Sequence, residues 1–189
     1  MRDLAYRVAG PADQSALAAL DDSFTTEYVY EVASGDVGFG LRLTAVYPPL
    51  VKVFPAEDGP EDEPEDGPED GGADDGRHEI VAVDADGRPV GFIAVAVEEW
   101  NRRLVVHQLT VGPGHRGRGI GGELMRRALA HGREHGARTA WLEVTSVNVP
   151  AVRAYRRMGF RLCGLDTTLY TGTESEGETA LFMARPLDR

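Results

Sequence analysis

The alternation of hydrophobic and polar residues predicts a chain that is rich in strands. Short apolar runs bounded by glycine, proline, aspartate or asparagine are typical of strands. Such runs occur at 4–8, 78–83, 88–99, 103–111, 139–145, 159–170 and 178–186, and the stretch 25–46 predicts an N-terminal β-hairpin region around a turn near SGDVG. The connections DADG and WN are short enough to predict antiparallel hairpins between the strands of 78–111.

Three segments have the pattern of helices. Pro11 begins a run of helix formers that continues to about Asp22. The segment 118–135 carries apolar residues on one side and arginines on the other, and 148–158 begins at Asn148, a residue type favoured at the N-cap. The order of strands and helices predicts an α/β (α+β) fold, a mixed central sheet flanked by helices.

Length and composition predict a single domain over residues 1–189. The chain has 189 residues, of which 42% are hydrophobic, so it can bury one core. No apolar run is long enough to span a membrane, and the N-terminal stretch has no apolar leader, so we expect no membrane partner. The single cysteine, Cys163, excludes an internal disulfide and fits a reducing compartment. These features predict a cytoplasmic protein, with Cys163 buried in its apolar strand.

Most of the net charge of −11 lies in one segment. Residues 57–76 hold eleven acidic residues and no basic one, which leaves 20 acidic and 20 basic residues elsewhere. A run of Glu, Asp, Gly and Pro with one alanine cannot bury enough apolar surface to become ordered, so we expect a disordered acidic insertion. Its charge would repel phosphates and predicts no nucleic-acid partner, but it could attract a cationic ligand.

The glycine-rich stretch GPGHRGRGIGGEL at 112–124 predicts a phosphate-binding turn. It follows a strand that ends at Val111 and precedes a helix, and the N-terminus of a helix attracts anions. The stretch lacks the Gly-Lys-Ser/Thr of a P-loop. Gly117, Gly119 and Gly122 match the dinucleotide pattern, with Glu143 downstream, but too many residues separate Val111 from Gly117 for a Rossmann turn.

Two motifs resemble a known superfamily. RGRGIG at 116–121 matches the pattern Arg/Gln-x-x-Gly-x-Gly/Ala of the GNAT acetyltransferases, and NVPAVRAYRRMGF at 148–160 is similar to their Asn-x-x-Ala-x-x-x-Tyr-x-x-x-Gly-Phe segment. The surrounding sequence, from DDSFTTEYVYEV to LYTGTESEGETALFMARP, resembles the streptothricin (nourseothricin) acetyltransferases of this superfamily nearly end to end. The resemblance implies a GNAT fold and an enzyme that acetylates an amine on the β-lysine arm of streptothricin, giving resistance.

The resemblance also implies acetyl-CoA as the co-substrate and assigns residues to it. Backbone groups along the end of a strand would hold the pantetheine, the glycine turn would hold the pyrophosphate, and Asn148 would contact the pantetheine arm. The implied binding residues are Leu109, Val111, Arg116, Gly117, Arg118, Gly119, Ile120, Gly121, Gly122, Asn148 and Tyr155.

The chemistry of acetyl transfer needs a proton donor and a proton acceptor. Tyr155 occupies the tyrosine position of the motif, and we expect it to protonate the departing thiolate. Many GNAT enzymes carry an acidic residue on the strand before the glycine turn, where this chain has His107 and Gln108. The proton acceptor is therefore open between Glu143, Glu98, Glu99, His107 and water, and we favour Glu143 acting through water.

The sequence also suggests contacts to a small cationic amine. Asp166, Glu98 and Glu99 could pair with a cationic arm, and Tyr28, Tyr30 and Phe39 could line its slot or simply pack across strands. His131 and His135 have a helical i, i+4 spacing but no third ligand, so we expect no metal.

Two other functions stay open: a GNAT acetyltransferase of another small amine or a protein N-terminus, and a non-catalytic acetyl-CoA-binding module. The sequence leaves the oligomeric state open, a homodimer included.

Overall fold

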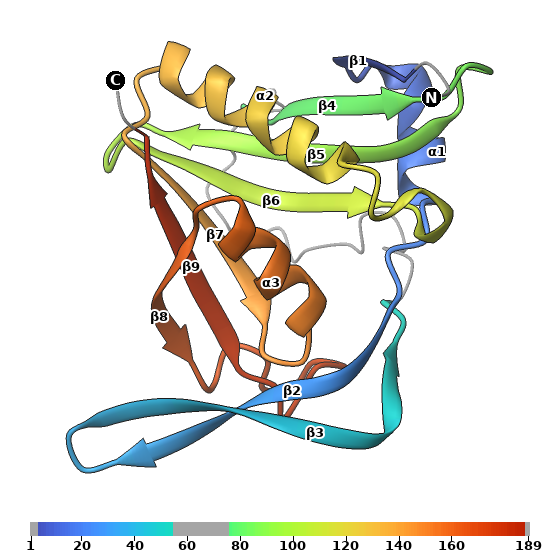
Figure 1. Cartoon of the computed structure of the whole chain (residues 1–189). Helices are drawn as coiled ribbons and strands as arrows, with labels where there is room; N and C mark the ends of the chain where they lie inside the picture. The colour runs from blue at the N-terminus through green and yellow to red at the C-terminus, as the bar shows by residue number, and fades with distance from the viewer. Residues whose placement is uncertain (1–3, 55–75, 188–189) are drawn as a thin grey trace.

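The computed structural model describes residues 4–54 and 76–187, which form a seven-stranded mixed sheet, a two-stranded sheet and the helices that cover them (Figure 1). The elements are β1 (Ala5–Val8), the 3-10 turn η1 (Pro11–Asp13), α1 (Gln14–Ala18), β2 (Phe24–Gly35), β3 (Gly38–Lys52), β4 (His78–Val83), β5 (Pro89–Glu98), β6 (Arg103–Val111), the 3-10 turn η2 (Pro113–His115), α2 (Ile120–Glu134), β7 (Thr139–Thr145), α3 (Val149–Arg157), β8 (Arg161–Asp166) and β9 (Ala180–Pro186). The predicted disordered insertion, 57–76, lies outside the described residues except for Gly76.

The large sheet has the strand order β1-β4-β5-β6-β7-β9-β8. Only β6 and β7 pair in parallel, and α2 forms the crossover between them. All other neighbouring strands are antiparallel. The mixed sheet flanked by helices is the predicted fold class. A parallel pair needs a crossover connection, which is usually a helix, and α2 is that connection.

Alternating side chains of the strands enter two different cores. Ile80 and Ala82 belong to the main core, together with Leu124 of α2 and residues of α3, which lie on one face of the sheet (Figure 1). Val81 and Val83 point to the other face and form a smaller core with Phe92 and Ala94 of β5 and Leu17 of α1. The long α2 therefore covers one side of β4, β5 and β6, and the short α1 packs on the other side, against β5.

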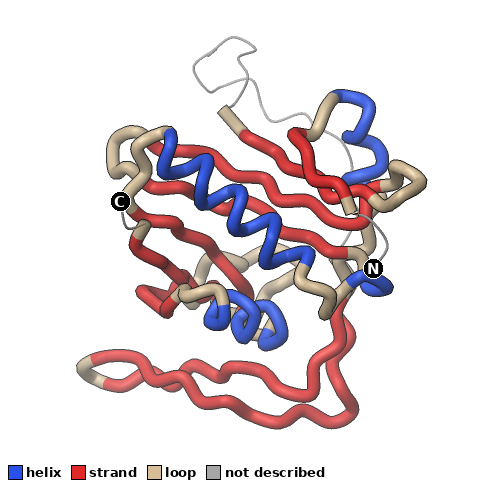
Figure 2. The backbone as a smooth tube through the Cα atoms, turned by 45° about the horizontal axis from the view of Figure 1, so that its top comes forward, coloured by secondary structure: helices blue, strands red, loops and turns tan. Residues whose placement is uncertain are grey.

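The hairpin of β2 and β3 projects from the rest of the molecule and crosses below α3 and the end of β7 (Figures 1 and 2). The middle of β2 is anchored to the residue after β7 by a hydrogen bond of 2.9 Å from the Tyr30 amide to the Ser146 carbonyl. Lys52, at the end of β3, forms a largely buried ion pair with Glu178, 2.6 Å from Nζ to Oε1. The predicted hairpin is confirmed, and it is longer than expected because β3 continues through Pro48 and Pro49 to Lys52.

Two predicted helices are shorter than the sequence suggested. The N-terminal helix ends at Ala18 instead of about Asp22, and the amide of Ser23 bonds to the Asp21 side chain, a local bond that competes with a helix. The second helix begins at Ile120, not Arg118, because Gly119 has φ = +85°, a left-handed conformation outside the helix.

The predictions at the C-terminal edge of the sheet also need correction. The strand expected over 159–170 spans only Arg161–Asp166 and is followed by turns. Cys163 is exposed, contrary to the prediction of a buried thiol, because β8 is the edge strand of the sheet. No helix in the described part of the chain is long and apolar enough to cross a membrane.

Candidate functional site

The strands β6 and β7 separate at the centre of the sheet. Their pairing joins Arg103–Val106 to Thr139–Leu142, whereas β6 continues to Val111 and β7 to Thr145. Between β5 and β6 the register jumps from Ala94–Gln108 to Val95–Val106, so His107 is an extra residue at the point of separation. A bulge of this kind bends a strand, and bulges are frequent beside active sites. In the described register, the edge of β6 that carries Leu109 and Val111 faces the opening between the strands, where an extended ligand could bond to the backbone.

The glycine-rich turn lies at the end of β6 and leads into α2. Gly117 and Gly119 have φ of +74° and +85°, which favours glycine at both positions. The first helical bond runs from the Glu123 amide to the Gly119 carbonyl at 3.0 Å, so the amides of Ile120, Gly121 and Gly122 precede it. An added Cβ at Gly117, Gly119 or Gly122 would meet no described atom within 4 Å. The turn thus presents bare backbone to open space at a positive helix end, which suits a phosphate.

The two arginines of the turn differ in their surroundings. The Arg116 guanidinium donates to the carbonyls of Val111 at 2.7 Å and Ser23 at 2.6 Å, so it braces the turn against the segment before β2. Arg118 is exposed and makes no hydrogen bond or ion pair within 4–54 and 76–187. The arrangement favours Arg118 over Arg116 as the side chain that could reach a phosphate.

The second motif forms α3, beside the separated strands. Asn148 is the N-cap residue, and its Oδ1 accepts the Ala151 amide at 3.1 Å, which leaves the side-chain amide for another contact. Tyr155 is 9% exposed and packs edge-on against Phe160. Burial, and then the negative charge of Glu143, raise the pKa of Tyr155 to about 12. The phenol therefore keeps its proton at neutral pH, as a proton donor must.

Glu143 lies on β7 one residue beyond its last pair with β6. Leu142 and Val144 belong to the main core, so the Glu143 side chain points to the face away from α2 and α3. Burial raises the pKa of Glu143, and a hydrogen bond from the Tyr170 hydroxyl opposes this rise. A half-buried carboxylate with a raised pKa can act as a proton acceptor.

A second carboxylate, Glu178, lies close to Glu143. Its Oε2 accepts a hydrogen bond from the Thr145 hydroxyl, and its Oε1 accepts Lys52 Nζ at 2.6 Å. Its charge contributes to the raised pKa of Glu143. Glu178 also lines a cavity of about 570 Å³ between the hairpin, the β7–α3 connection and the segment before β9. This cavity adjoins the end of β7 and is large enough for part of a small molecule.

The predicted substrate residues are only partly brought together. Tyr30 lines the cavity, and Tyr28 lies on the same strand under Arg153 at 5.5 Å. Asp166 accepts the amides of Thr168 and Leu169 through Oδ1 and so holds the turn after β8. Phe39 is 61% exposed at the tip of the hairpin. Tyr30 is therefore the best placed of these residues.

Glu98 and Glu99 lie away from the other predicted residues. Glu98 lies opposite Arg103 in the β5–β6 register, at the end of β6 that is far from the glycine turn. Its carboxylate accepts a hydrogen bond from the Asn101 side-chain amide at 2.5 Å. The structure therefore does not bring Glu98 and Glu99 to the opening between β6 and β7.

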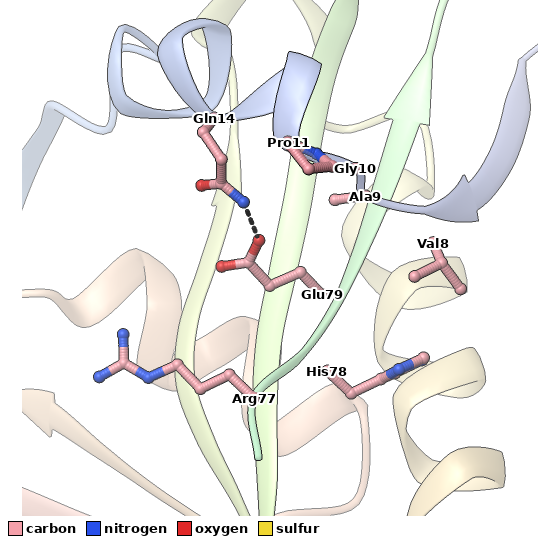
Figure 3. Close-up of a pocket in the computed structure, with 8 residues that line it drawn as sticks. All are labelled: Val8, Ala9, Gly10, Pro11, Gln14, Arg77, His78 and Glu79. Carbon is pink, nitrogen blue, oxygen red and sulfur yellow. Dashed lines mark hydrogen bonds between the residues drawn. The ribbon is translucent and has the colours of Figure 1, made fainter. Parts of the chain in front are cut away.

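A further hollow of about 440 Å³ lies beside β1 and β4, at the outer edge of the sheet (Figure 3). In this hollow the Gln14 side-chain amide donates a hydrogen bond to the Glu79 carboxylate.

Sequence reasoning missed Tyr170, Glu178 and Lys52. Tyr170 is 27 residues from Glu143, and Lys52 is 126 residues from Glu178, so no local spacing connects them. One signal was available, since Lys52 is the only lysine of the chain.

Comparison with known proteins gives consistent matches. The profile of the Acetyltransferase (GNAT) family matches residues 44–160. A streptothricin acetyltransferase of Streptomyces lavendulae is 53% identical over 181 residues, which cover 96% of this chain and 94% of that protein. The crystal structure of a nourseothricin acetyltransferase superposes with a TM-score of 0.87 at 47% identity, over 98% of this chain and 99% of that one. A Bacillus anthracis protein solved in complex with acetyl coenzyme A has the same fold, with a TM-score of 0.76 at 22% identity over 98% of this chain and 99% of that one.

Proposed function

The chain belongs to the acetyltransferase (GNAT) family, and on this premise we propose that it transfers the acetyl group of acetyl-CoA to an amine on the β-lysine moiety of streptothricin-class antibiotics, giving resistance. Acetyl-CoA-dependent N-acetylation is the activity of the family. The observation that carries the substrate is the 53% identity over nearly the whole chain to a streptothricin acetyltransferase.

The residues present fit acetyl-CoA. The open amides of Ile120, Gly121 and Gly122 at the start of α2, with Arg118 beside them, suit the pyrophosphate. Beyond Val106, β6 has no strand partner on the side of β7, and its backbone at Leu109 and Val111 suits the amide-bearing pantetheine arm, which would bond to it as an added strand does. The Val111 carbonyl already accepts the Arg116 guanidinium.

The proposed chemistry assigns one proton to each of two residues. The amine nitrogen attacks the thioester carbonyl, a C–N bond forms and the C–S bond breaks. Glu143 takes the proton that the nitrogen loses, directly or through water, and Tyr155 gives a proton to the leaving sulfur. The net result is an amide and a thiol, and the proton held by Glu143 returns through solvent to Tyr155. Glu143 and Tyr155 are close enough for the charge of one to affect the pKa of the other.

The acceptor side of the site is the cavity at the end of β7. Its lining includes Tyr30 and two carboxylates, Glu31 and Glu178. Glu31 pairs with Arg42, which also lines the cavity, at 2.7 Å, and Glu178 pairs with Lys52 at 2.6 Å, so a cationic arm would share these carboxylates with the cations of the protein. Carboxylates and an aromatic ring are the groups that recognise an alkylammonium. We assign the cationic arm of the antibiotic to this cavity.

A panel of acceptors tests the proposal. Thiol release from acetyl-CoA is measured with streptothricin, spermidine and a lysine-containing peptide at equal concentration. We expect kcat/KM for streptothricin to exceed the others by at least about 100-fold, which corresponds to at least about 2.7 kcal/mol of transition-state binding. Equal rates would contradict the substrate assignment, and binding of coenzyme A without turnover of any amine would contradict the enzyme assignment.

A further inference from the structure

The segment 167–178, between β8 and β9, provides two contacts to the acceptor side of the site. The Tyr170 hydroxyl donates to Glu143 Oε1, and Glu178 binds Thr145, two residues further along β7. Both contacts reach the side chains of β7 that point away from α2 and α3. The segment is therefore coupled to Glu143 at two positions.

We propose that Tyr170 and Glu178 act through Glu143: Tyr170 orients its carboxylate, and Glu178 places a second negative charge behind it. This inference rests on the proposed function, in which Glu143 accepts the proton of the attacking amine. Tyr170 and Glu178 are positioning residues, since neither is assigned a contact to the reacting atoms.

The geometry of Tyr170 supports an orienting role. Its hydroxyl engages Oε1 of Glu143, which leaves Oε2 for the proton of the amine or of an intervening water. Hydrogen bonds to a carboxylate are short and directional, so one such bond restricts the rotation of the group. The Thr145 hydroxyl also interacts with Tyr170, which links the phenol to the Glu178 side of the cluster.

The position of Glu178 is fixed by its own partners. Its two oxygens accept Thr145 Oγ1 and Lys52 Nζ, and Lys52 also donates to Ser175 at 2.9 Å. The Glu178 side chain is 15% exposed, so solvent screens its charge only weakly. Two ionisable groups, Tyr170 and Glu178 from the segment 167–178, lie on the same side of the sheet as Glu143, with Lys52 of β3 behind Glu178. Tyr155 of α3 belongs to the core on the other side, and the charge of Glu143 raises its pKa from there.

The two residues have opposite effects on Glu143. The hydrogen bond from Tyr170 stabilises the charged carboxylate and lowers the pKa of Glu143, whereas the charge of Glu178 raises that pKa. Activity is lost at low pH when Glu143 becomes protonated. Removing the Tyr170 hydroxyl should therefore move the acid limb of the pH profile to higher pH, and removing the Glu178 charge should move it to lower pH.

The test compares pH profiles of kcat/KM for the wild type, Tyr170→Phe and Glu178→Gln with streptothricin as acceptor. The ionisation of the substrate amine is common to all three proteins and cancels in the comparison. We expect the opposite shifts described above and a loss of about tenfold in kcat for Tyr170→Phe. Tyr6→Phe is the matched control, because Tyr6 is a partly buried tyrosine on β1, and it should leave the profile unchanged.

A double-mutant cycle gives a readout that does not depend on the folding of Glu178→Gln. If Tyr170 acts through Glu143, adding Tyr170→Phe to Glu143→Gln costs no further activity. Coincident acid limbs for Tyr170→Phe and the wild type, or additive losses in the cycle, would overturn the inference. Full turnover by Glu143→Gln would instead remove Glu143 as the base, which is a failure of the proposed function and is read separately.

Discussion

Tyr155 and Glu143 acquire their proposed roles from the same environment. Burial is the first cause of the raised pKa in both residues, and for Tyr155 the Glu143 charge adds to it. A phenol with a pKa of about 12 is a weak acid compared with a free thiol, whose pKa is about 8.5. A thiolate that leaves inside the same low-dielectric site is also desolvated, which raises its own proton affinity and reduces the difference.

Replacing Tyr155 by phenylalanine removes the proposed proton donor and little else. We expect kcat to fall by about 100-fold, a usual contribution of general acid catalysis, with unchanged affinity for acetyl-CoA. Thiol release gives kcat, and isothermal titration with coenzyme A gives the affinity. A variant with wild-type turnover would exclude Tyr155 from the mechanism. The Tyr6→Phe protein serves again as the reference for loss of a phenolic oxygen.

The residues of the glycine turn and of α3 could be predicted from the sequence because each lies in a contiguous motif. The pairing of Tyr170 with Glu143 could not, because it depends on how a segment with few apolar residues folds back over a strand 27 residues earlier. Asp166 is a predicted substrate residue whose carboxylate has another role in the structure. It was a reasonable cation partner by charge, but its Oδ1 is engaged by the backbone of its own turn.

At the level of elements, we propose the start of α2 as the donor site. Gly119 ends the turn in a left-handed conformation, and the next three amides precede the first helical bond. The sequence correctly predicted a glycine-rich turn between a strand and a helix. It placed the start of the helix two residues too early, since spacing alone does not reveal which glycine has a positive φ.

Gly119→Val should abolish detectable binding of coenzyme A. A β-branched residue at φ = +85° costs about 1–2 kcal/mol and puts methyl groups where the phosphate would lie. Gly136→Ala is the control, because Gly136 also has a positive φ of 79° but lies beyond the other end of α2. Calorimetry that shows equal uptake of coenzyme A by Gly119→Val and the wild type would refute the role of the turn.

Strand limits were predicted best where apolar runs end at strong turn formers. The limits of 78–83 and 139–145 agree with β4 and β7 to the residue. The limits at the C-terminal edge agree less well. After Asp166 the chain continues with polar and glycine-rich turns, and only pairing with β9 decides where β8 ends.

At the scale of the whole molecule, the Lys52–Glu178 ion pair connects the projecting hairpin to the segment before β9. A two-stranded hairpin is marginally stable by itself in water, so β2 and β3 depend on contacts with the body of the protein. The Lys52–Glu178 pair is one such contact, and both side chains are less than one-sixth exposed, at 14% and 15%.

Lys52→Met should lower the free energy of unfolding by about 3 kcal/mol, because it leaves the Glu178 carboxylate buried without its cation. Urea denaturation followed by circular dichroism measures the change. Arg88→Met disrupts a pair whose side chains are 78% and 71% exposed and should have no measurable effect. If the two variants were equally stable, the Lys52–Glu178 pair would not anchor the hairpin.

The Lys52–Glu178 pair also protects the protein from acylating its own lysine. An enzyme that binds an activated acyl donor exposes its own amines to acylation, and lysine side chains are the usual targets. This chain has a single lysine, and its amine is enclosed between Glu178 and Ser175. The folded protein thus offers its bound thioester no ε-amino nucleophile at the surface, and mass spectrometry after prolonged incubation with donor alone should find Lys52 unacylated.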